Sequence, residues 1–189
     1  VRAIGLDLDD TLWPIWPIIA RAERAVQDWL LQAAPATVAR HDAKAMRALR
    51  DGLLRQRPEL AADLSALRRE SIRAALLAAG DDPALAEPAF EVFFAERQRV
   101  ELFDDALPAL QRLAQRWPIV GITNGNADLD RVGLSRYFIG CLSARSFGVG
   151  KPDAAIFHAA CSQLGAEPAR VLHIGDRKST RLNSSHRLT

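Results

Sequence analysis

Short apolar runs and longer amphipathic segments alternate along much of this chain. The runs are nearly continuous, which is typical of strands covered on both faces, and they predict strands at residues 3–8, 118–123, 138–142 and 171–174. Apolar residues at helical spacing predict helices at residues 106–116, 128–136 and 153–164. Because strands that alternate with helices indicate a parallel sheet, the predicted fold class is α/β.

The middle of the chain shows a different pattern, with no convincing strand between residues 17 and 99. Apolar residues recur at helical spacing from Ile18 to Leu30, and further helices are predicted at residues 40–56, 58–79 and 83–98. The predicted organisation is a discontinuous core of residues 1–12 and 103–176, interrupted by an all-helical insertion of residues 13–102.

The composition is that of a globular protein. Of the 189 residues, 49% are hydrophobic and 25% are charged. No apolar run approaches the roughly 20 residues needed to span a bilayer, and no signal peptide opens the chain, so no membrane partner is expected. Cys141 and Cys161 show neither metal-ligand spacing nor a CxxC pattern, which favours a reduced, cytoplasmic setting.

The last residues, 177–189, have no hydrophobic period and resemble a translated frame of a sequencing-library adapter. We treat this tail as non-native and exclude it from fold reasoning. Its four Arg and Lys residues account for the basic balance, because the net charge changes from +2 to −2 without them. No nucleic-acid partner is therefore predicted. The core is expected to be C-terminally truncated, so this chain could be poorly stable or inactive.

Three carboxylates gather at the end of the first predicted strand, at Asp7, Asp9 and Asp10. At close range, like charges repel by several kcal/mol even at an effective dielectric of about 20, so something must compensate. Mg²⁺ is the natural compensator, because it takes oxygen ligands from one or two carboxylates and from water and substrate phosphate.

Other polar residues follow the later strands. Thr123 and Asn124 end the second predicted strand, Lys151 lies in the glycine-containing loop GVGKP, and Asp176 follows the last predicted strand. In a parallel sheet the ligand binds outside the carboxyl ends of the strands, so these residues are predicted to converge on the acidic cluster.

This set of residues suits phosphoryl transfer. Asp7 can attack phosphorus, and Asp9 can protonate the leaving oxygen and then activate water. Thr123 and the following backbone amides can bind phosphate oxygens, Lys151 can supply positive charge, and Asp176 can supply a second carboxylate for the metal.

Each motif alone also has a structural explanation, as a strand-end turn, a helix cap or a surface lysine. Asp10 is assigned a structural role, and His173 is expected in the core or behind the site. The pair Trp13 and Trp16 either packs between the insertion and the core or forms an aromatic wall for a flat ring in the substrate; packing is favoured.

The stretches DLDDTL, ITNGN, GKP and HIGD, in this order over residues 1–176, resemble the four signatures of the haloacid dehalogenase superfamily. More narrowly, they resemble its phosphatases that carry a helical cap after the first motif. The resemblance implies a Rossmannoid parallel sheet with an inserted cap. It assigns the nucleophile to Asp7, the acid/base to Asp9, phosphate binding to Thr123, Asn124 and Lys151, and Mg²⁺ binding to Asp7, Asp9 and Asp176.

The activity implied is Mg²⁺-dependent hydrolysis of a phosphomonoester through an aspartyl-phosphate. A small phosphorylated metabolite such as FMN, or the ribitylaminouracil phosphate of riboflavin synthesis, is the implied substrate. The family usually places further acids after the Gly-Asp pair, where this chain has Arg177 and Arg181. That departure is attributed to the tail.

Other functions stay open as alternatives. A 2-haloacid dehalogenase shares the fold and the nucleophile but does not use the second aspartate, so Asp9 argues against it. A catalytically silent binding protein on the same fold would be expected to lose Asp7 or Asp9, and both are present. A catalytically silent, truncated fragment stays open as an alternative. A receiver domain would need its phosphoacceptor on a later strand. The oligomeric state is left open.

Overall fold

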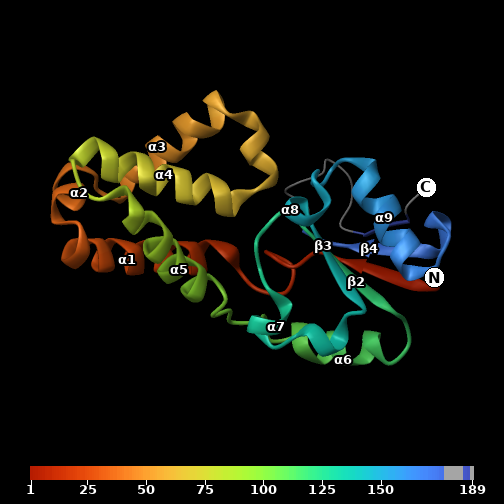
Figure 1. The fold of residues 1–189 in the computed structure, drawn as a ribbon. Coiled ribbons are helices and arrows are strands. Elements are labelled where there is room, and N and C mark those ends of the chain that lie inside the picture. Colours follow the sequence, from red (N-terminus) through yellow and green to blue (C-terminus); the bar gives the residue numbers. More distant parts are fainter. Residues whose placement is uncertain (177–184, 188–189) are drawn as a thin grey trace. The chain divides into compact units, whose positions relative to one another are not determined.

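The computed structural model describes residues 1–176 and, for the backbone, residues 185–187. These residues form two compact units (Figure 1): one contains Val1–Ile15 and the described residues from Val100 onward, and the other is Trp16–Arg99. The predicted core and insertion differ from these units by three residues at each border. The predicted non-native tail lies outside the described residues except for the backbone of 185–187.

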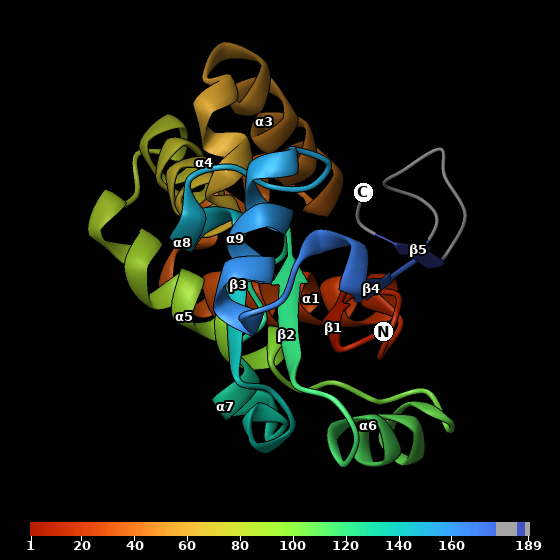
Figure 2. The ribbon, with the colours of Figure 1, turned by 90° about the vertical axis from the view of Figure 1, so that its right-hand side faces the viewer.

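The first unit is built on a sheet with strand order β3-β2-β1-β4-β5 (Figures 1 and 2). The strands are β1 (Ala3–Leu6), β2 (Ile119–Thr123), β3 (Gly140–Ser143), β4 (Val171–Ile174) and β5 (Ser185–Arg187). β1 to β4 are parallel, and β5 pairs antiparallel with β4. The α/β prediction is confirmed, and each predicted strand is present. β5 lies in the tail that the sequence reasoning excluded.

Register brings the carboxyl ends of the central strands to one edge of the sheet. Leu6 of β1 is aligned with Gly121 of β2 and with Ile174 of β4. β1 and β2 are buried along their whole length, which explains their continuous apolar sequences. Asp7 and the residues that follow β2 and β4 therefore leave the sheet at the same edge.

The helices of this unit are α6 (Ala106–Ala114), α7 (Leu129–Val132), α8 (Ala144–Phe147) and α9 (Ala154–Leu164), with 3₁₀ turns η3 (Ser135–Tyr137) and η4 (Pro168–Arg170). α9 lies against the sheet (Figure 2), where Ile156 and Ala160 join the buried cluster of Val120 and Ile122.

One helix prediction was wrong in this unit, and one short helix was missed. The helix predicted at residues 128–136 is broken, because Gly133 adopts a left-handed conformation with φ 82° and ends α7 before η3 begins. α8 was not predicted. It is a single short turn whose capping box is formed by Ser143 and Ser146, with the Ser146 N–H donating to Ser143 Oγ at 3.0 Å.

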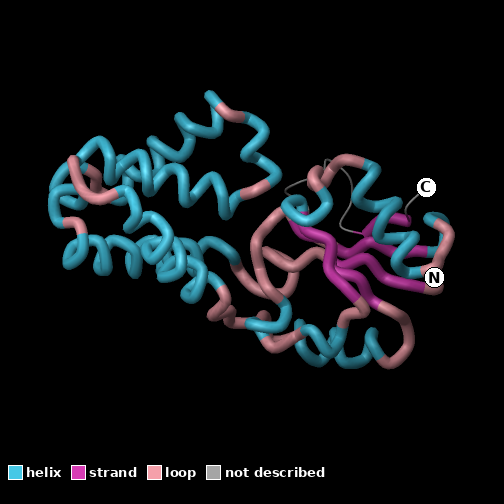
Figure 3. Tube along the Cα trace, in the orientation of Figure 1, coloured by secondary structure: helices cyan, strands magenta, loops and turns pink. Residues whose placement is uncertain are grey.

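The second unit contains only helices among its residues 16–99 (Figure 3), as predicted. They are α1 (Ile15–Ala33), α2 (Pro35–Arg40), α3 (Ala43–Gln56), α4 (Leu64–Ala79) and α5 (Ala86–Arg97), with 3₁₀ turns η1 (Pro58–Ala62) and η2 (Pro83–Leu85). α2 was not predicted, and the predicted helices 58–79 and 83–98 each begin with a 3₁₀ turn.

The core of the helical unit is shared mainly by α1, α4 and α5, and its largest members are Phe90 and Phe93. The guanidinium of Arg68 lies 3.6 Å from the centre of the Phe93 ring, and that of Arg69 lies 3.7 Å from the centre of Phe90. α3 contributes no fully buried residue. In the part of the chain that is described, no helix has the length and apolar character of a membrane span.

Candidate active site

Asp7 and Lys151 form a buried ion pair at the carboxyl edge of the sheet. Lys151 Nζ lies 2.6 Å from Asp7 Oδ1, and the Leu8 N–H donates to the same oxygen at 2.8 Å. The two residues are 7% and 8% exposed. Burial raises the pKa of Asp7 above its ordinary value, while the Lys151 charge and hydrogen bond act in the opposite direction. The pair predicted from distant motifs is thus in direct contact.

The residues at the end of β4 and just after it lie close to Asp7. The Asp7 N–H donates to the Ile174 carbonyl at 2.9 Å. A Cβ placed on Gly175 would lie 3.0 Å from Asp7 Cβ and 3.5 Å from Asp7 Oδ2, so glycine permits this approach. The Asp176 N–H donates to Thr11 Oγ1 at 3.0 Å. The backbone of Asp176 therefore lies beside the loop that carries the acidic cluster.

Asp9 is held by an aromatic side chain. Trp13 is fully buried, and its indole Nε1–H donates to Asp9 Oδ1 at 2.8 Å. The Trp16 side chain is 69% exposed, so the two tryptophans lie in different environments. Whether they pack between the insertion and the core or face a substrate stays a prediction. Asp10 has φ 57° and accepts a hydrogen bond from the Ile15 N–H at 3.0 Å, in agreement with its predicted structural role.

The segment after β2 binds the lysine loop. Thr123 is buried, and its Oγ1 accepts a hydrogen bond from the Gly125 N–H at 2.9 Å. The Lys151 N–H donates to Asn124 Oδ1 at 2.7 Å, and Asn124 Nδ2 donates to the Lys151 carbonyl at 2.8 Å. The side chain of Asn124 therefore holds Lys151, and the predicted contact of Asn124 with phosphate stays a prediction for its main-chain N–H.

Gly150 is the residue that lets this loop approach Asn124. A Cβ on Gly150 would lie 2.5 Å from Asn124 Oδ1 and 2.9 Å from Ala144 Cβ, closer than real contacts allow. The roles of Gly150 and of the Trp13 hydrogen bond were not predicted from the sequence. The only signals for them were the glycines of GVGKP and the spacing of Trp13 four residues after Asp9.

The donor set at this edge suits a hard cation. Among the described residues, no group of three or more His, Cys, Asp or Glu side chains is placed to hold a metal ion. Mg²⁺ does not need such a cage, because it keeps several waters and binds through one or two carboxylates plus substrate oxygens. Gly175 approaches Asp7 Oδ2 closely, and Asp176 is the next residue in the chain. These residues fit Mg²⁺.

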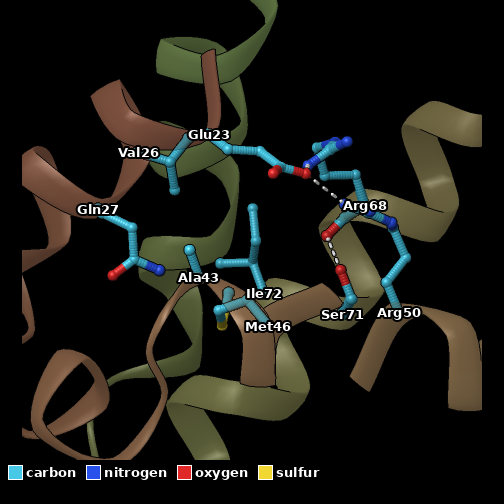
Figure 4. A pocket seen from close by; sticks show the side chains of 9 residues that line it. All are labelled: Glu23, Val26, Gln27, Ala43, Met46, Arg50, Arg68, Ser71 and Ile72. Atoms are coloured by element: carbon cyan, nitrogen blue, oxygen red, sulfur yellow. Dashed lines mark hydrogen bonds and ion pairs between the residues drawn. The ribbon is translucent and has the colours of Figure 1, made fainter. Parts of the chain in front are cut away.

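A small pocket in the helical unit contains none of the predicted site residues (Figure 4). It lies among α1, α3 and α4, has a volume of about 30 Å³, and leaves room for one or two waters. Glu23 Oε1 lies 3.0 Å from Arg50 Nη1 and 3.5 Å from Arg68 Nη1, and Glu23 Oε2 lies 3.2 Å from Arg47 Nη1. Burial, and then the charge of Arg50, lowers the pKa of Arg68 to about 9. We interpret this cluster as a structural ion network.

The parallel sheet presents a buried aspartate–lysine pair beside further acidic and hydroxyl groups, which indicates an enzyme of the α/β class. The family model described as "haloacid dehalogenase-like hydrolase" matches residues 1–179. The chain belongs to this family, as the sequence motifs indicated.

Relatives within the family include phosphatases. The 5-amino-6-(5-phospho-D-ribitylamino)uracil phosphatase of Escherichia coli K12 is 32% identical over 184 residues, which cover 95% of this chain and 77% of that protein. The phosphoserine phosphatase of Thermus thermophilus is 34% identical over 115 residues, or 58% of this chain and 46% of that protein. The predicted enzyme class, a phosphatase of this family, is supported by both.

A solved structure described as a 2-haloacid dehalogenase from Pseudomonas syringae pv. tomato has the same fold. It superposes with a TM-score of 0.88 and 38% sequence identity, and the match covers 95% of this chain and 79% of that chain. The predicted fold class is therefore confirmed by an experimental structure.

Proposed function

We propose that this protein is a Mg²⁺-dependent phosphomonoesterase that works through an aspartyl-phosphate on Asp7. The observation that carries the proposal is the buried Asp7–Lys151 pair at the carboxyl edge of the sheet, 2.6 Å apart. A buried carboxylate is a strong candidate nucleophile because few waters solvate it, and the lysine keeps a fixed positive charge beside the phosphoryl group.

In the first half-reaction, an oxygen of Asp7 attacks phosphorus and the bond from phosphorus to the ester oxygen breaks. Asp9, in its protonated form, gives its proton to that leaving oxygen. Proton transfer by a positioned side chain typically contributes about 10²–10⁴-fold to the rate. The Thr123 hydroxyl already accepts from Gly125, so its own proton can be donated to a phosphate oxygen.

In the second half-reaction, water attacks phosphorus, the bond between Asp7 and phosphorus breaks, and inorganic phosphate is released. The Asp9 carboxylate takes the proton of the attacking water and is ready for the next cycle. Lys151 stays in place through both steps, because the Asn124 side chain binds both its main-chain N–H and its main-chain carbonyl.

Mg²⁺ would be held by Asp7, the main-chain carbonyl of Asp9 and Asp176. When bound, it supplies charge that reduces the repulsion between the nucleophile and the phosphate dianion. The proposal is supported by the chemistry of these oxygen donors.

For the substrate we infer a small phosphorylated metabolite, such as FMN or the ribitylaminouracil phosphate of riboflavin synthesis. The support is the similarity to the E. coli relative, a 5-amino-6-(5-phospho-D-ribitylamino)uracil phosphatase. The match covers 77% of that protein. We further infer a cytoplasmic enzyme with no nucleic-acid or membrane partner. Cys141 and Cys161 are both unpaired thiols, in line with a reduced setting.

A second candidate function is hydrolysis of 2-haloacids, favoured by the similarity to the P. syringae structure. Asp7 would then attack carbon and release halide. That chemistry has no leaving oxygen to protonate, so it gives Asp9 no role. The presence of Asp9 beside Asp7 favours the phosphatase.

The test measures phosphate release from FMN and a panel of monoesters, with Mg²⁺ and with a chelator, and halide release from 2-chloropropionate. We expect phosphate release that needs Mg²⁺ and is abolished by Asp7→Asn. Asp130→Asn, at an exposed position of α7, is the matched control and should keep full activity. Halide release without Mg²⁺, activity retained in Asp7→Asn, or a folded protein inactive on every monoester would each contradict the proposal.

A further inference from the structure

We propose that Trp13 is a positioning residue for Asp9, and that its buried indole N–H fixes the orientation of the carboxyl group that transfers the proton. This inference rests on the proposed phosphatase function. The hydrogen bond from Trp13 Nε1 to Asp9 Oδ1 measures 2.8 Å, which is a well-formed bond for this donor and acceptor.

Trp13 is itself held rigidly. Its side chain is fully buried, and its carbonyl accepts a hydrogen bond from the Asp10 N–H at 2.8 Å. On either side of it, the Ile15 N–H donates to Asp10 Oδ1 at 3.0 Å and the Phe103 N–H donates to the Leu12 carbonyl at 3.0 Å. The indole is therefore presented to Asp9 from a fixed backbone.

An indole N–H can only donate, and it does not release its proton at neutral pH. It can thus orient a carboxylate without competing with it as an acid. In the first step the proton of the oriented Asp9 carboxyl group moves to the leaving oxygen as the phosphorus–oxygen bond breaks, and in the second step the Asp9 carboxylate receives a proton from the attacking water.

A purely structural role would reverse this relationship, with Asp9 serving only to satisfy a buried indole. The two roles differ in how the effect of a variant depends on the leaving group. Trp13→Phe keeps a buried ring and removes the N–H. A misdirected general acid slows the expulsion of a basic leaving group most, since an acidic one departs without a proton.

The experiment compares an alkyl monoester, FMN, with p-nitrophenyl phosphate, which has an acidic leaving group. For Trp13→Phe we expect kcat/KM on FMN to fall about 10- to 100-fold and kcat/KM on p-nitrophenyl phosphate to fall less than about threefold, because kcat/KM reports the steps up to departure of the leaving group and excludes the hydrolysis of the shared aspartyl-phosphate. Trp117→Phe makes the same substitution elsewhere in the unit and should leave the kinetic parameters on both substrates unchanged. Should Trp13→Phe fold poorly, benzothienylalanine at position 13 keeps the shape of the indole and lacks the N–H.

A second readout does not depend on activity. In protein labelled with ¹⁵N at the indoles, the resonance absent from Trp13→Phe belongs to Trp13. We expect Asp9→Ala to shift it and Asp130→Ala to leave it in place. An unshifted resonance would show that the hydrogen bond is absent and overturn the proposal.

The kinetic outcomes separate this proposal from the function on which it rests. Equal losses of kcat/KM on both esters, or none, in an active enzyme would overturn the positioning role of Trp13 alone. A folded wild-type protein that hydrolyses no phosphomonoester would overturn the proposed function, and the role of Trp13 with it, even where the indole resonance responds to Asp9→Ala.

Discussion

The carboxamide of Asn124 binds both main-chain polar groups of Lys151, accepting from its N–H at 2.7 Å and donating to its carbonyl at 2.8 Å. This paired contact fixes the backbone from which the Lys151 side chain reaches Asp7, 2.6 Å away. Lys151 lies in a loop, and holding its long side chain in one place costs conformational entropy. By fixing the backbone of Lys151, the Asn124 amide limits the positions that this side chain can reach.

Removing the Asn124 amide should therefore reduce activity through Lys151. We expect Asn124→Ala to lower kcat about 10- to 100-fold, since a displacement of about 1 Å at a reacting centre can cost that much. The free energy of unfolding should fall by only about 0.5–1.5 kcal/mol, because water can replace the lost hydrogen bonds at this exposed side chain. Steady-state kinetics and urea unfolding measure the two effects.

Asn124→Asp keeps the acceptor for the Lys151 N–H and loses the donor to its carbonyl, so its kcat should lie between those of the wild type and Asn124→Ala. Gln163→Ala removes an exposed carboxamide from α9 and serves as the control. Wild-type kcat in Asn124→Ala would show that Lys151 needs no such support.

Gly150 should be as sensitive as Asn124, for a steric reason. In Gly150→Ala the new methyl group would meet Asn124 Oδ1 at 2.5 Å, so the loop must shift. We expect kcat to fall at least about 10-fold and the free energy of unfolding to fall by about 1–3 kcal/mol, as for other overpacked sites.

The matched control is Gly52→Ala on α3, where the nearest atom to the new Cβ is Arg55 Nη2 at 3.8 Å. There the substitution should stabilise the protein by about 0.5–1 kcal/mol, because alanine favours the helix, and leave kcat unchanged. The same assays apply. Equal effects of the two substitutions would mean that the crowding at Gly150 is relieved without harm.

Much of the fold could be predicted because burial leaves a periodic signal. β1 and β2 are covered on both faces and therefore read as continuous apolar runs, and α1 carries its buried residues at helical spacing. The errors occur where local turn chemistry overrides that signal. Gly133 ends α7 within a segment that otherwise reads as one helix, and α8 is too short to show a period.

The residues of the candidate site could be predicted from the sequence, but the contacts among them could not. Motif order placed Asp7 and Lys151 at one edge of a parallel sheet, and the structure brings them into contact. The partners of Asn124 and Trp13 were not predictable, because each depends on where a side chain points once the loops have folded. The pattern of apolar positions carries no such information.

The ion network of the helical unit offers a test of stability without activity. Glu23 faces Arg47, Arg50 and Arg68, so Glu23→Gln would leave three guanidinium groups without their carboxylate. We expect the free energy of unfolding to fall by about 1–3 kcal/mol, less than the 3–5 kcal/mol of a fully buried pair because this network is partly exposed.

Glu70→Gln is the control, since the pair of Glu70 and Arg73 is more open, with side chains 38% and 33% exposed. Its loss should stay within about 0–1 kcal/mol. Urea unfolding followed by far-ultraviolet circular dichroism measures both variants. A loss for Glu23→Gln no larger than that of Glu70→Gln would show that the three arginines do not depend on Glu23.

Cys141 on β3 should be an unreactive thiol at neutral pH. Burial raises its pKa to about 11, so the reactive thiolate is a minor species at every pH below that value. We expect the rate of alkylation by iodoacetamide to rise about tenfold per pH unit from about pH 7 to about pH 10, whereas the rate for an ordinary thiol levels off above its pKa of about 8.5.

Mass spectrometry of tryptic peptides measures the alkylation of Cys141 separately from that of Cys161. Circular dichroism confirms the fold at each pH, and urea-unfolded protein supplies the profile of an ordinary thiol. A rate that levels off near pH 9 in the folded protein would mean that Cys141 is solvated, and that β3 is less well covered than the structure shows.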